Sequence, residues 1–182
     1  MAALFPPWAN TATYAVLALV AGGAVAAIVT PMLYARSSYA TGEGDPIVQP
    51  IAFDHRHHVR DEKIACAFCH ESAWTSANAG VPPTERCLGC HAQIWNDSAE
   101  ILPLRQSAAS HQPIRWQRVH SLPDFVFFDH RVHVHDGVQC AECHGHVEDM
   151  AVVYQAKPLT MKWCLDCHRQ RSAPTHCSAC HR

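Results

Sequence analysis

Three features are missing from this chain of 182 residues. No Asp, Glu, Lys or Arg precedes Arg36. Basic residues are not in excess, because 14 Lys and Arg stand against 16 Asp and Glu, and we therefore expect no nucleic-acid partner. Residues 51–182 have no long helical or strand periodicity, and prolines and turn residues recur in them. That part of the chain has few means of building an apolar core of its own.

The uncharged N-terminal segment has the length and composition of a membrane span. The run Tyr14–Tyr34, YAVLALVAGGAVAAIVTPMLY, contains 21 residues. As a helix it would extend over about 30 Å, the thickness of a bilayer core. Trp8 and Tyr39 add to the aromatic residues at its two ends, as expected at membrane–water interfaces. A cleaved signal peptide is the alternative, but this run is longer than a signal core and has no positive charge ahead of it.

The composition predicts three parts. Residues 1–35 form a membrane anchor, with a transmembrane helix at about 13–34. Residues 36–50, RSSYATGEGDPIVQP, form a linker, because Gly, Ser, Pro and charged residues replace the apolar run. Residues 51–182 form the remaining domain, and all 15 histidines lie there. Histidine is the commonest metal ligand, so this excess indicates a metal.

The domain contains an internal repeat. Its first copy begins FDHRHHVRDEKIACAFCH at Phe53, and its second begins FDHRVHVHDGVQCAECH at Phe128, with one gap between the two. A further CxxCH follows each copy, so the repeat covers residues 51–91 and 128–168. A last CxxCH stands outside the repeat at 177–181. We expect a duplicated unit with one motif added at the C-terminus.

Five CxxCH motifs, here numbered first to fifth in chain order, contain all ten cysteines. CxxCH is the attachment signature of c-type haem. Two thiols at this spacing reach the two vinyl groups on one porphyrin edge, and the next residue places its imidazole under the iron. The predicted attachment cysteines are Cys66, Cys69, Cys87, Cys90, Cys140, Cys143, Cys164, Cys167, Cys177 and Cys180. The predicted proximal iron ligands are His70, His91, His144, His168 and His181.

Zinc and disulfide bonds are the alternative uses of these cysteines. CxxC pairs build tetrahedral zinc sites, but a zinc ribbon does not require a histidine after every second cysteine. Disulfide bonds between the two cysteines of a CxxC would also do little to stabilise a fold. Five covalently bound haem c groups, large and mostly apolar, would supply the missing interior. The predicted fold class is therefore a single N-terminal transmembrane helix plus a mostly irregular, short-helix multihaem cytochrome c domain organised around five haems.

Ten histidines remain for the far side of the five irons. The repeat offers two pairs spaced i, i+3, which leave one face of a helical turn together. One ring of a pair can reach the haem of its own repeat and the other a neighbouring haem. The candidate distal ligands are His55, His58, His120, His130, His133 and Met161.

These six candidates exceed the five irons by one. Met161 alternatively fills an irregular gap in the packing, as thioethers often do. The other histidines are expected at the surface or beside haem propionates. They are His57, His111, His135, His146 and His176.

Several stretches resemble a known family. The sequences AGVPPTERCLGCH, VHSLPDFVFFDHRVH, CAECHG and PLTMKWCLDCHR are similar to the pentahaem cytochrome subunit of bacterial alternative complex III, as is FPPWAN before a single span. The HxxH pairs are similar to those of c3- and c7-type multihaem cytochromes. The chain departs from the family pattern in the short segment 169–176 between the fourth and fifth motifs. The distal ligand of the fifth haem is left open by this departure.

The resemblance implies an electron-transfer subunit, not an enzyme on its own, in a quinol-oxidising respiratory or photosynthetic complex. Implied partners are the lipid bilayer, an iron–sulfur molybdopterin-enzyme-like subunit, quinol-binding membrane subunits and a monohaem cytochrome c. The implied location is the bacterial inner (cytoplasmic) membrane, with a single span and the pentahaem domain on the periplasmic or outer side. A stand-alone membrane-anchored multihaem quinol dehydrogenase and a multihaem reductase with an open haem are the alternatives.

Overall fold

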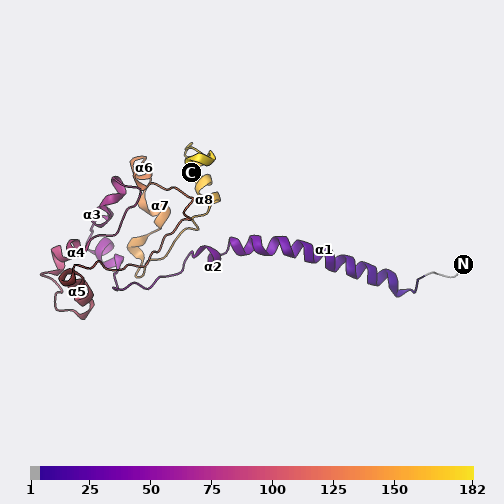
Figure 1. Cartoon of the computed structure of the whole chain (residues 1–182), viewed down its shortest axis with the longest axis horizontal. Coiled ribbons are helices and arrows are strands. Elements are labelled where there is room, and N and C mark those ends of the chain that lie inside the picture. The colour runs from indigo at the N-terminus through magenta and orange to yellow at the C-terminus, as the bar shows by residue number, and fades with distance from the viewer. Residues whose placement is uncertain (1–4) are drawn as a thin grey trace. The chain divides into compact units, whose positions relative to one another are not determined.

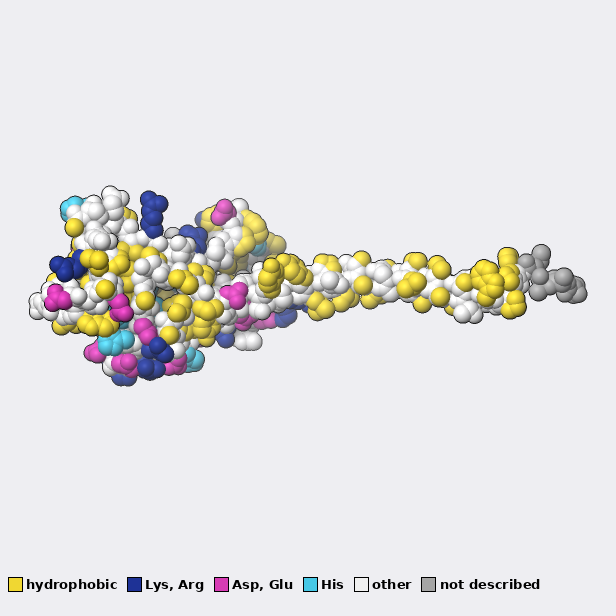
Figure 2. All heavy atoms as spheres, turned by 90° about the horizontal axis from the view of Figure 1, so that it is seen from below, with side chains coloured by type: hydrophobic (Ala, Val, Ile, Leu, Met, Phe, Trp, Pro, Cys, Tyr) yellow, Lys and Arg dark blue, Asp and Glu magenta, His cyan; other side chains and the backbone are white. Residues whose placement is uncertain are grey.

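The computed structural model describes residues 5–182 and divides into two compact units at Thr41/Gly42. The first unit consists of one long helix, α1 (Trp8–Ala35), followed by the short α2 (Ser38–Thr41). None of the residues of α1 is buried, and the helix is long and apolar enough to cross a membrane. Figure 2 shows hydrophobic side chains along its visible face, with no charged side chain among them. The helix begins before the predicted start at residue 13 and includes Pro31 near its end.

The second unit is built from short helices joined by irregular chain (Figure 1). Among residues 5–182 there is no β-strand, and isolated bridges join Glu43 to Gln155 and Pro46 to Tyr154. The predicted fold class, one long apolar helix followed by short helices in an irregular chain, is confirmed. The helices are η1 (Arg56–Asp61), α3 (Cys66–Cys69), η2 (Glu71–Trp74), α4 (Thr84–His91), η3 (Ala99–Ile101), α5 (Leu102–Ser110), α6 (His130–His135), α7 (Cys140–His144), η4 (Val147–Asp149), α8 (Met161–Gln170) and η5 (Cys177–Ala179).

The second unit has very little core of its own. Its buried apolar side chains in the described chain are Ala73, Ile101, Leu104 and Met150, and no large side chain is fully buried. Large apolar side chains close to the motifs are exposed instead, among them Phe68 and Val132 at 47% and 59%. Exposed apolar surface on this scale marks a place where another group binds. The polypeptide is therefore shaped around something that it does not itself supply.

The first repeat copy is one residue longer than the second, and this additional residue lies within a helix. In the second copy α6 is an α-helix, and Asp136 N donates to Val132 O, four residues back, at 3.1 Å. In the first copy η1 is a π-helix, and Glu62 N donates to His57 O, five residues back, at 3.0 Å. A π-turn accommodates one additional residue and is often found at functional sites. The additional residue follows His58, so His55 and His58 keep the i, i+3 spacing that His130 and His133 have in the second copy.

Gly145, directly after the third motif, has a backbone conformation that only glycine adopts easily, with φ 70° and ψ −168°. A Cβ at this position would lie 2.6 Å from the Cβ of Ala156. We expect Gly145→Ala to destabilise the folded protein by about 1–3 kcal/mol from backbone strain alone. The thermal midpoint of the purified holoprotein would fall by several degrees.

Gly89, inside the second motif, provides the matched control. It lies in α4, and its Cβ would meet nothing within 4 Å. Gly89→Ala should leave the midpoint unchanged or raise it, because alanine is the better helix former. Equal midpoints for the two variants would show that Gly145 is not under this constraint.

Candidate haem-binding sites

Each CxxCH motif lies on a helical turn. The first is carried by α3, the second by α4, the third by α7, the fourth by α8 and the fifth by η5. Residues three apart on such a turn are neighbours on one face, so both thiols of a motif point toward the same side. None of the ten cysteines takes part in a disulfide bond.

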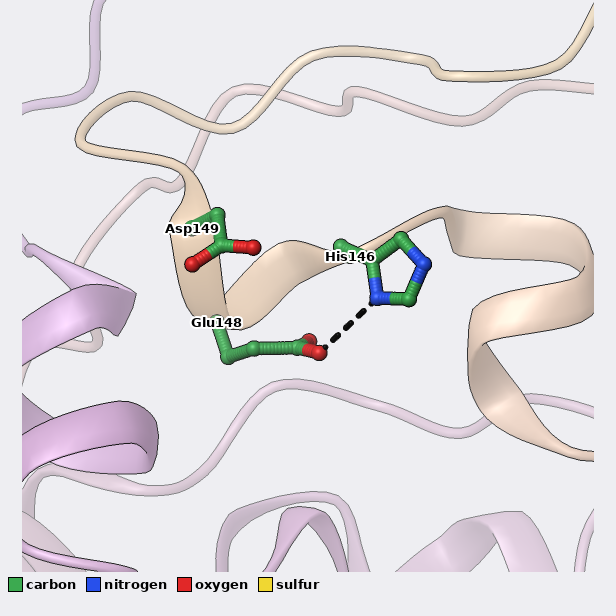
Figure 3. A group of neighbouring side chains, drawn as sticks. All are labelled: His146, Glu148 and Asp149. Carbon is green, nitrogen blue, oxygen red and sulfur yellow. Dashed lines mark hydrogen bonds and ion pairs between the residues drawn. The ribbon is translucent and has the colours of Figure 1, made fainter.

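The geometry also disfavours zinc. Among residues 5–182, one group of three or more His, Cys, Asp or Glu side chains has ligand atoms within 4.8 Å of one another, and it is His146, Glu148 and Asp149. Figure 3 shows that no cysteine takes part in it. His146 Nδ1 lies 3.0 Å from Glu148 Oε1, and its side chain is 76% exposed. A closed tetrahedral Cys and His site for zinc does not form in the described residues.

Backbone carbonyls orient four of the five predicted proximal histidines. The Nδ1 atoms of His70, His91, His168 and His181 lie 2.7, 3.3, 2.6 and 3.0 Å from the carbonyl oxygens of Gly80, Ile94, Pro174 and Phe125. A carbonyl oxygen only accepts a hydrogen bond, so each ring carries its proton on Nδ1. Nε2 then keeps its lone pair for a metal, which is the arrangement that metal-ligating histidines commonly have.

Three of the predicted distal histidines share this arrangement. His58 Nδ1 lies 3.0 Å from Asp54 O and His133 Nδ1 lies 2.8 Å from Asp129 O, at equivalent places in the two repeat copies. His130 Nδ1 lies 2.8 Å from Ala77 O. The remaining histidine of the two HxxH pairs, His55, has a buried Nδ1 without a hydrogen-bond partner.

Within the described residues, the histidines expected to lie outside the iron sites lack the bond from Nδ1 to a carbonyl. His135 uses its other nitrogen, Nε2, which lies 3.2 Å from Trp74 O. The Nδ1 atoms of His146 and His176 contact the side chains of Glu148 and Ser178. The Nδ1–carbonyl bond therefore separates most of the predicted ligands from the remaining histidines.

Three pairs of histidine rings have the spacing expected of two ligands on opposite sides of one metal. An imidazole bonds a metal at about 2 Å, so the centroids of two rings on opposite sides of one metal lie roughly 6 Å apart. The centroids of His58 and His91 are 6.2 Å apart, and those of His133 and His168 are 6.1 Å apart. These two pairs are equivalent in the two repeat copies. Each joins the second histidine of an HxxH pair to the later CxxCH of its own copy.

A third pair has the same spacing. The centroids of His130 and His144 are 6.2 Å apart, and their planes differ by 7°. By the repeat, the equivalent pair in the first copy is His55 with His70. Burial, together with the proximity of His70, lowers the pKa of His55 to about 4. The pKa of His144 is also lowered to about 4 by burial. Both imidazoles are therefore neutral at pH 7, as a metal ligand must be.

A phenylalanine and an ion pair hold each HxxH pair in place. Phe53 stacks on His58 at 4.3 Å between centroids, and Phe128 stacks on His133 at 4.4 Å. Asp54 and Arg56 form an ion pair at 2.7 Å in the first copy, and Asp129 and Arg131 form the equivalent one at 2.9 Å. The Arg56 side chain lowers the pKa of Asp54 to about 2. The sequence FDHR thus positions both rings of each pair.

Contacts between distant segments connect the second motif to the first, and the first to the third. Arg86, next to Cys87, forms an ion pair with Glu71 and places its guanidinium 5.1 Å from the centroid of the Phe68 ring. Downstream of the first motif, Ala77 O accepts hydrogen bonds from both the backbone N and the ring of His130, at 3.1 and 2.8 Å. The two repeat copies therefore meet at their first motifs.

The third motif is connected to the fourth, and the fourth to the fifth. Arg171, after the fourth motif, donates to both carboxylate oxygens of Glu142 at 2.9 and 2.7 Å. A cavity of about 260 Å³ between these motifs is lined by residues that include Cys143, Trp163 and Cys167. At each junction, a cysteine of one motif lies close enough to a cysteine of the neighbouring motif for the two to interact electrostatically. These cysteines, each with its neighbour, are Cys87 with Cys69, Cys140 with Cys66, Cys143 with Cys167, and Cys164 with Cys180.

The two remaining distal candidates lie in different surroundings. Met161 is the first residue of α8 and is 63% exposed. His120 lies beside His144, with His144 Nδ1 3.3 Å from His120 Nε2. Among the described residues, neither His70 nor His181 has a histidine ring at the spacing of the three pairs above. The repeat offers His55 as the partner of His70, but it offers no histidine for His181, which lies outside the repeat.

The chain is similar to a protein described as the multihaem cytochrome c subunit of a menaquinone reductase in Nitratidesulfovibrio vulgaris strain Hildenborough. The two are 27% identical over 163 aligned residues, which cover 74% of this chain and 77% of that protein. No protein-family model matches the chain. Together with the five motifs and the paired histidines, this similarity supports a multihaem cytochrome c.

Proposed function

We propose that this chain is the electron-transfer subunit of a membrane complex that oxidises quinol or reduces quinone, and that it carries electrons through five c-type haems. The observation that carries the proposal is the set of opposing histidine rings at 6.1 and 6.2 Å. Such pairs occupy both axial positions of an iron and leave no open position for a substrate. A bis-histidine iron exchanges electrons only.

The residues of each site fit a covalently bound haem. The two cysteines of a CxxCH would hold the porphyrin edge, and the histidine that follows would take one axial position. Haem supplies a one-electron couple whose potential depends on the axial ligands and on burial. The protein fixes the orientation of the histidine rings through the Nδ1–carbonyl bonds. It also brings the haem sites close to one another in space. We propose the pairs His55–His70, His58–His91, His130–His144 and His133–His168, with Met161 opposite His181.

The proposed electron path does not follow chain order. The contacts between motifs favour the order second, first, third, fourth, fifth, with the two repeat copies meeting in the middle. The second and fifth motifs then form the two ends. One end would face the electron donor and the other the acceptor, on the periplasmic side of the bacterial inner membrane, with α1 as the anchor.

We propose the alternative complex III type of complex because the resemblance extends from the N-terminal segment to the fourth motif. Its partners would be quinol-binding membrane subunits, an iron–sulfur molybdopterin-enzyme-like subunit and a monohaem cytochrome c. The relative in Nitratidesulfovibrio vulgaris is a subunit of a menaquinone reductase, which supports the link to quinone. The two types differ in direction, since quinol is the donor in one and quinone the acceptor in the other.

Rapid mixing with a reduced menaquinone analogue tests the proposal. In the intact complex, purified in mild detergent, quinol should reduce the c-type haems within the turnover time. The isolated chain should stay oxidised on that timescale, because we propose that the quinol pocket lies in the membrane subunits. Equal reduction rates for complex and isolated chain would instead identify a stand-alone quinol dehydrogenase. Proteomics of the complex would identify the partner subunits.

Met161 gives a separate prediction. A thioether is a weaker donor to ferric iron than imidazole, so a Met-ligated haem has the higher potential. Met161→His should keep every iron low-spin and lower one midpoint potential of five. Met161→Leu should produce one high-spin iron, although the two side chains have similar volumes. A redox titration of the Leu variant that overlays the wild type, with no high-spin signal, would remove Met161 from the site.

A further inference from the structure

His120 is a distal candidate that the proposed pairs leave without an iron. It lies in the irregular segment before α6, far from any CxxCH in the sequence. Its side chain reaches His144, the proximal histidine of the third motif, and the centroids of the two rings are 4.4 Å apart. The same His144 lies 6.2 Å from His130. The third site thus has two neighbouring histidines for one axial position.

The ring spacing distinguishes the two neighbours. Rings on opposite sides of one metal have centroids roughly 6 Å apart, which His130 matches and His120, at 4.4 Å, does not. The His120 and His144 planes differ by 84°, and His120 Nε2 lies 3.3 Å from His144 Nδ1. The contact is therefore made to the nitrogen of His144 that faces away from an iron.

The position of His120 Nε2 corresponds to that of a backbone carbonyl at the other sites. His70, His91, His168 and His181 each direct Nδ1 at a carbonyl oxygen. For His144, the group that contacts Nδ1 is the imidazole of His120. A neutral imidazole accepts through its unprotonated nitrogen.

We infer that His120 is not an iron ligand but a positioning residue, which accepts the hydrogen bond from Nδ1–H of His144 and so orients Nε2 of that ring toward the third iron. This inference rests on the proposed haem sites. An acceptor at Nδ1 raises the basicity of a ligating imidazole. A more basic ligand stabilises the ferric state, so the contact holds the potential of the third haem below the value it would have without it.

Three variants of the full complex test the inference. His120→Leu removes the acceptor, His120→Gln retains one in its side-chain carbonyl oxygen, and His130→Ala removes the proposed distal ligand. Haem content is measured first, by pyridine haemochrome against protein mass. Electron paramagnetic resonance then counts high-spin irons, and a redox titration gives the potentials.

We expect His120→Leu to keep five low-spin irons and to raise one midpoint potential. His120→Gln should return that potential toward the wild-type value, and His130→Ala should produce one high-spin iron. One high-spin iron in both His120 variants would overturn the inference, because it would make His120 a ligand. An unchanged titration of His120→Leu would overturn it as well. Fewer than five haems in the unmodified complex would count instead against the proposed function.

Discussion

Replacement of His58 by alanine should convert one of the five irons from low-spin to high-spin. His58 lies 6.2 Å from His91 between ring centroids, and its Nδ1 is bound to Asp54 O at 3.0 Å. Its loss would leave the iron bound by His91 with one axial histidine. The opposite axial position would then hold water or stay empty. Loss of an imidazole donor also raises the potential of that haem. Electron paramagnetic resonance of the oxidised protein measures the spin state directly.

His57 supplies a matched control from the adjacent position. It lies in the same π-helix as His58, and its ring contacts that of His58 edge-on at 5.4 Å. No bond to a carbonyl fixes its Nδ1 within the described structure. His57→Ala should therefore keep all five irons low-spin with unchanged potentials. A high-spin iron in the His57 variant, or none in the His58 variant, would contradict the proposed pairing.

Removal of residues 1–41 should release the remaining protein from the membrane. This segment is the first compact unit and contains α1, whose residues are all outside any core. A helix of 28 residues with this composition is long enough to span a bilayer core of about 30 Å. With a cleavable export signal in its place, residues 42–182 should be recovered as a soluble protein with its haems attached.

The full chain, expressed and fractionated in the same way, is the control for this deletion. It should sediment with the membranes and resist extraction by high salt, because its attachment is apolar rather than electrostatic. If the truncated protein sediments quantitatively with membranes stripped of partner subunits, α1 is not the anchor.

The cysteines and the histidine after each pair could be predicted as haem-binding residues from the sequence, because covalent attachment requires a fixed local spacing. The HxxH pairs were readable because the repeat shows them twice. The same holds for the long apolar helix, whose composition determines it. These features depend on residues close together in the chain, so their geometry follows from sequence alone.

The partners of these rings depend on packing between distant segments, which no local pattern reveals. His130 bonds to Ala77 O across 53 residues, and His181 bonds to Phe125 O across 56. The π-helix η1 was also not foreseen, although the one-residue gap between the repeat copies was its signal. The contact between His120 and His144 spans 24 residues and had no sequence signal at all.

The linker predicted at 36–50 illustrates the same difference. Its composition indicates irregular chain, yet Gln49 exchanges two hydrogen bonds with the backbone of Gln117, at 3.0 and 2.9 Å. Gly44 N also donates to Gln155 O at 2.8 Å. The C-terminal part of this segment therefore belongs structurally to the second unit, whose boundary lies at Gly42.

The number of covalent haems per chain tests the central claim most directly. Intact-mass spectrometry of the purified protein gives the number of haem additions, and a pyridine haemochrome assay against protein mass gives the ratio independently. We expect five haems, one for each CxxCH, and no zinc by metal analysis. A ratio of four or fewer in fully matured protein, or stoichiometric zinc on the cysteines, would contradict it.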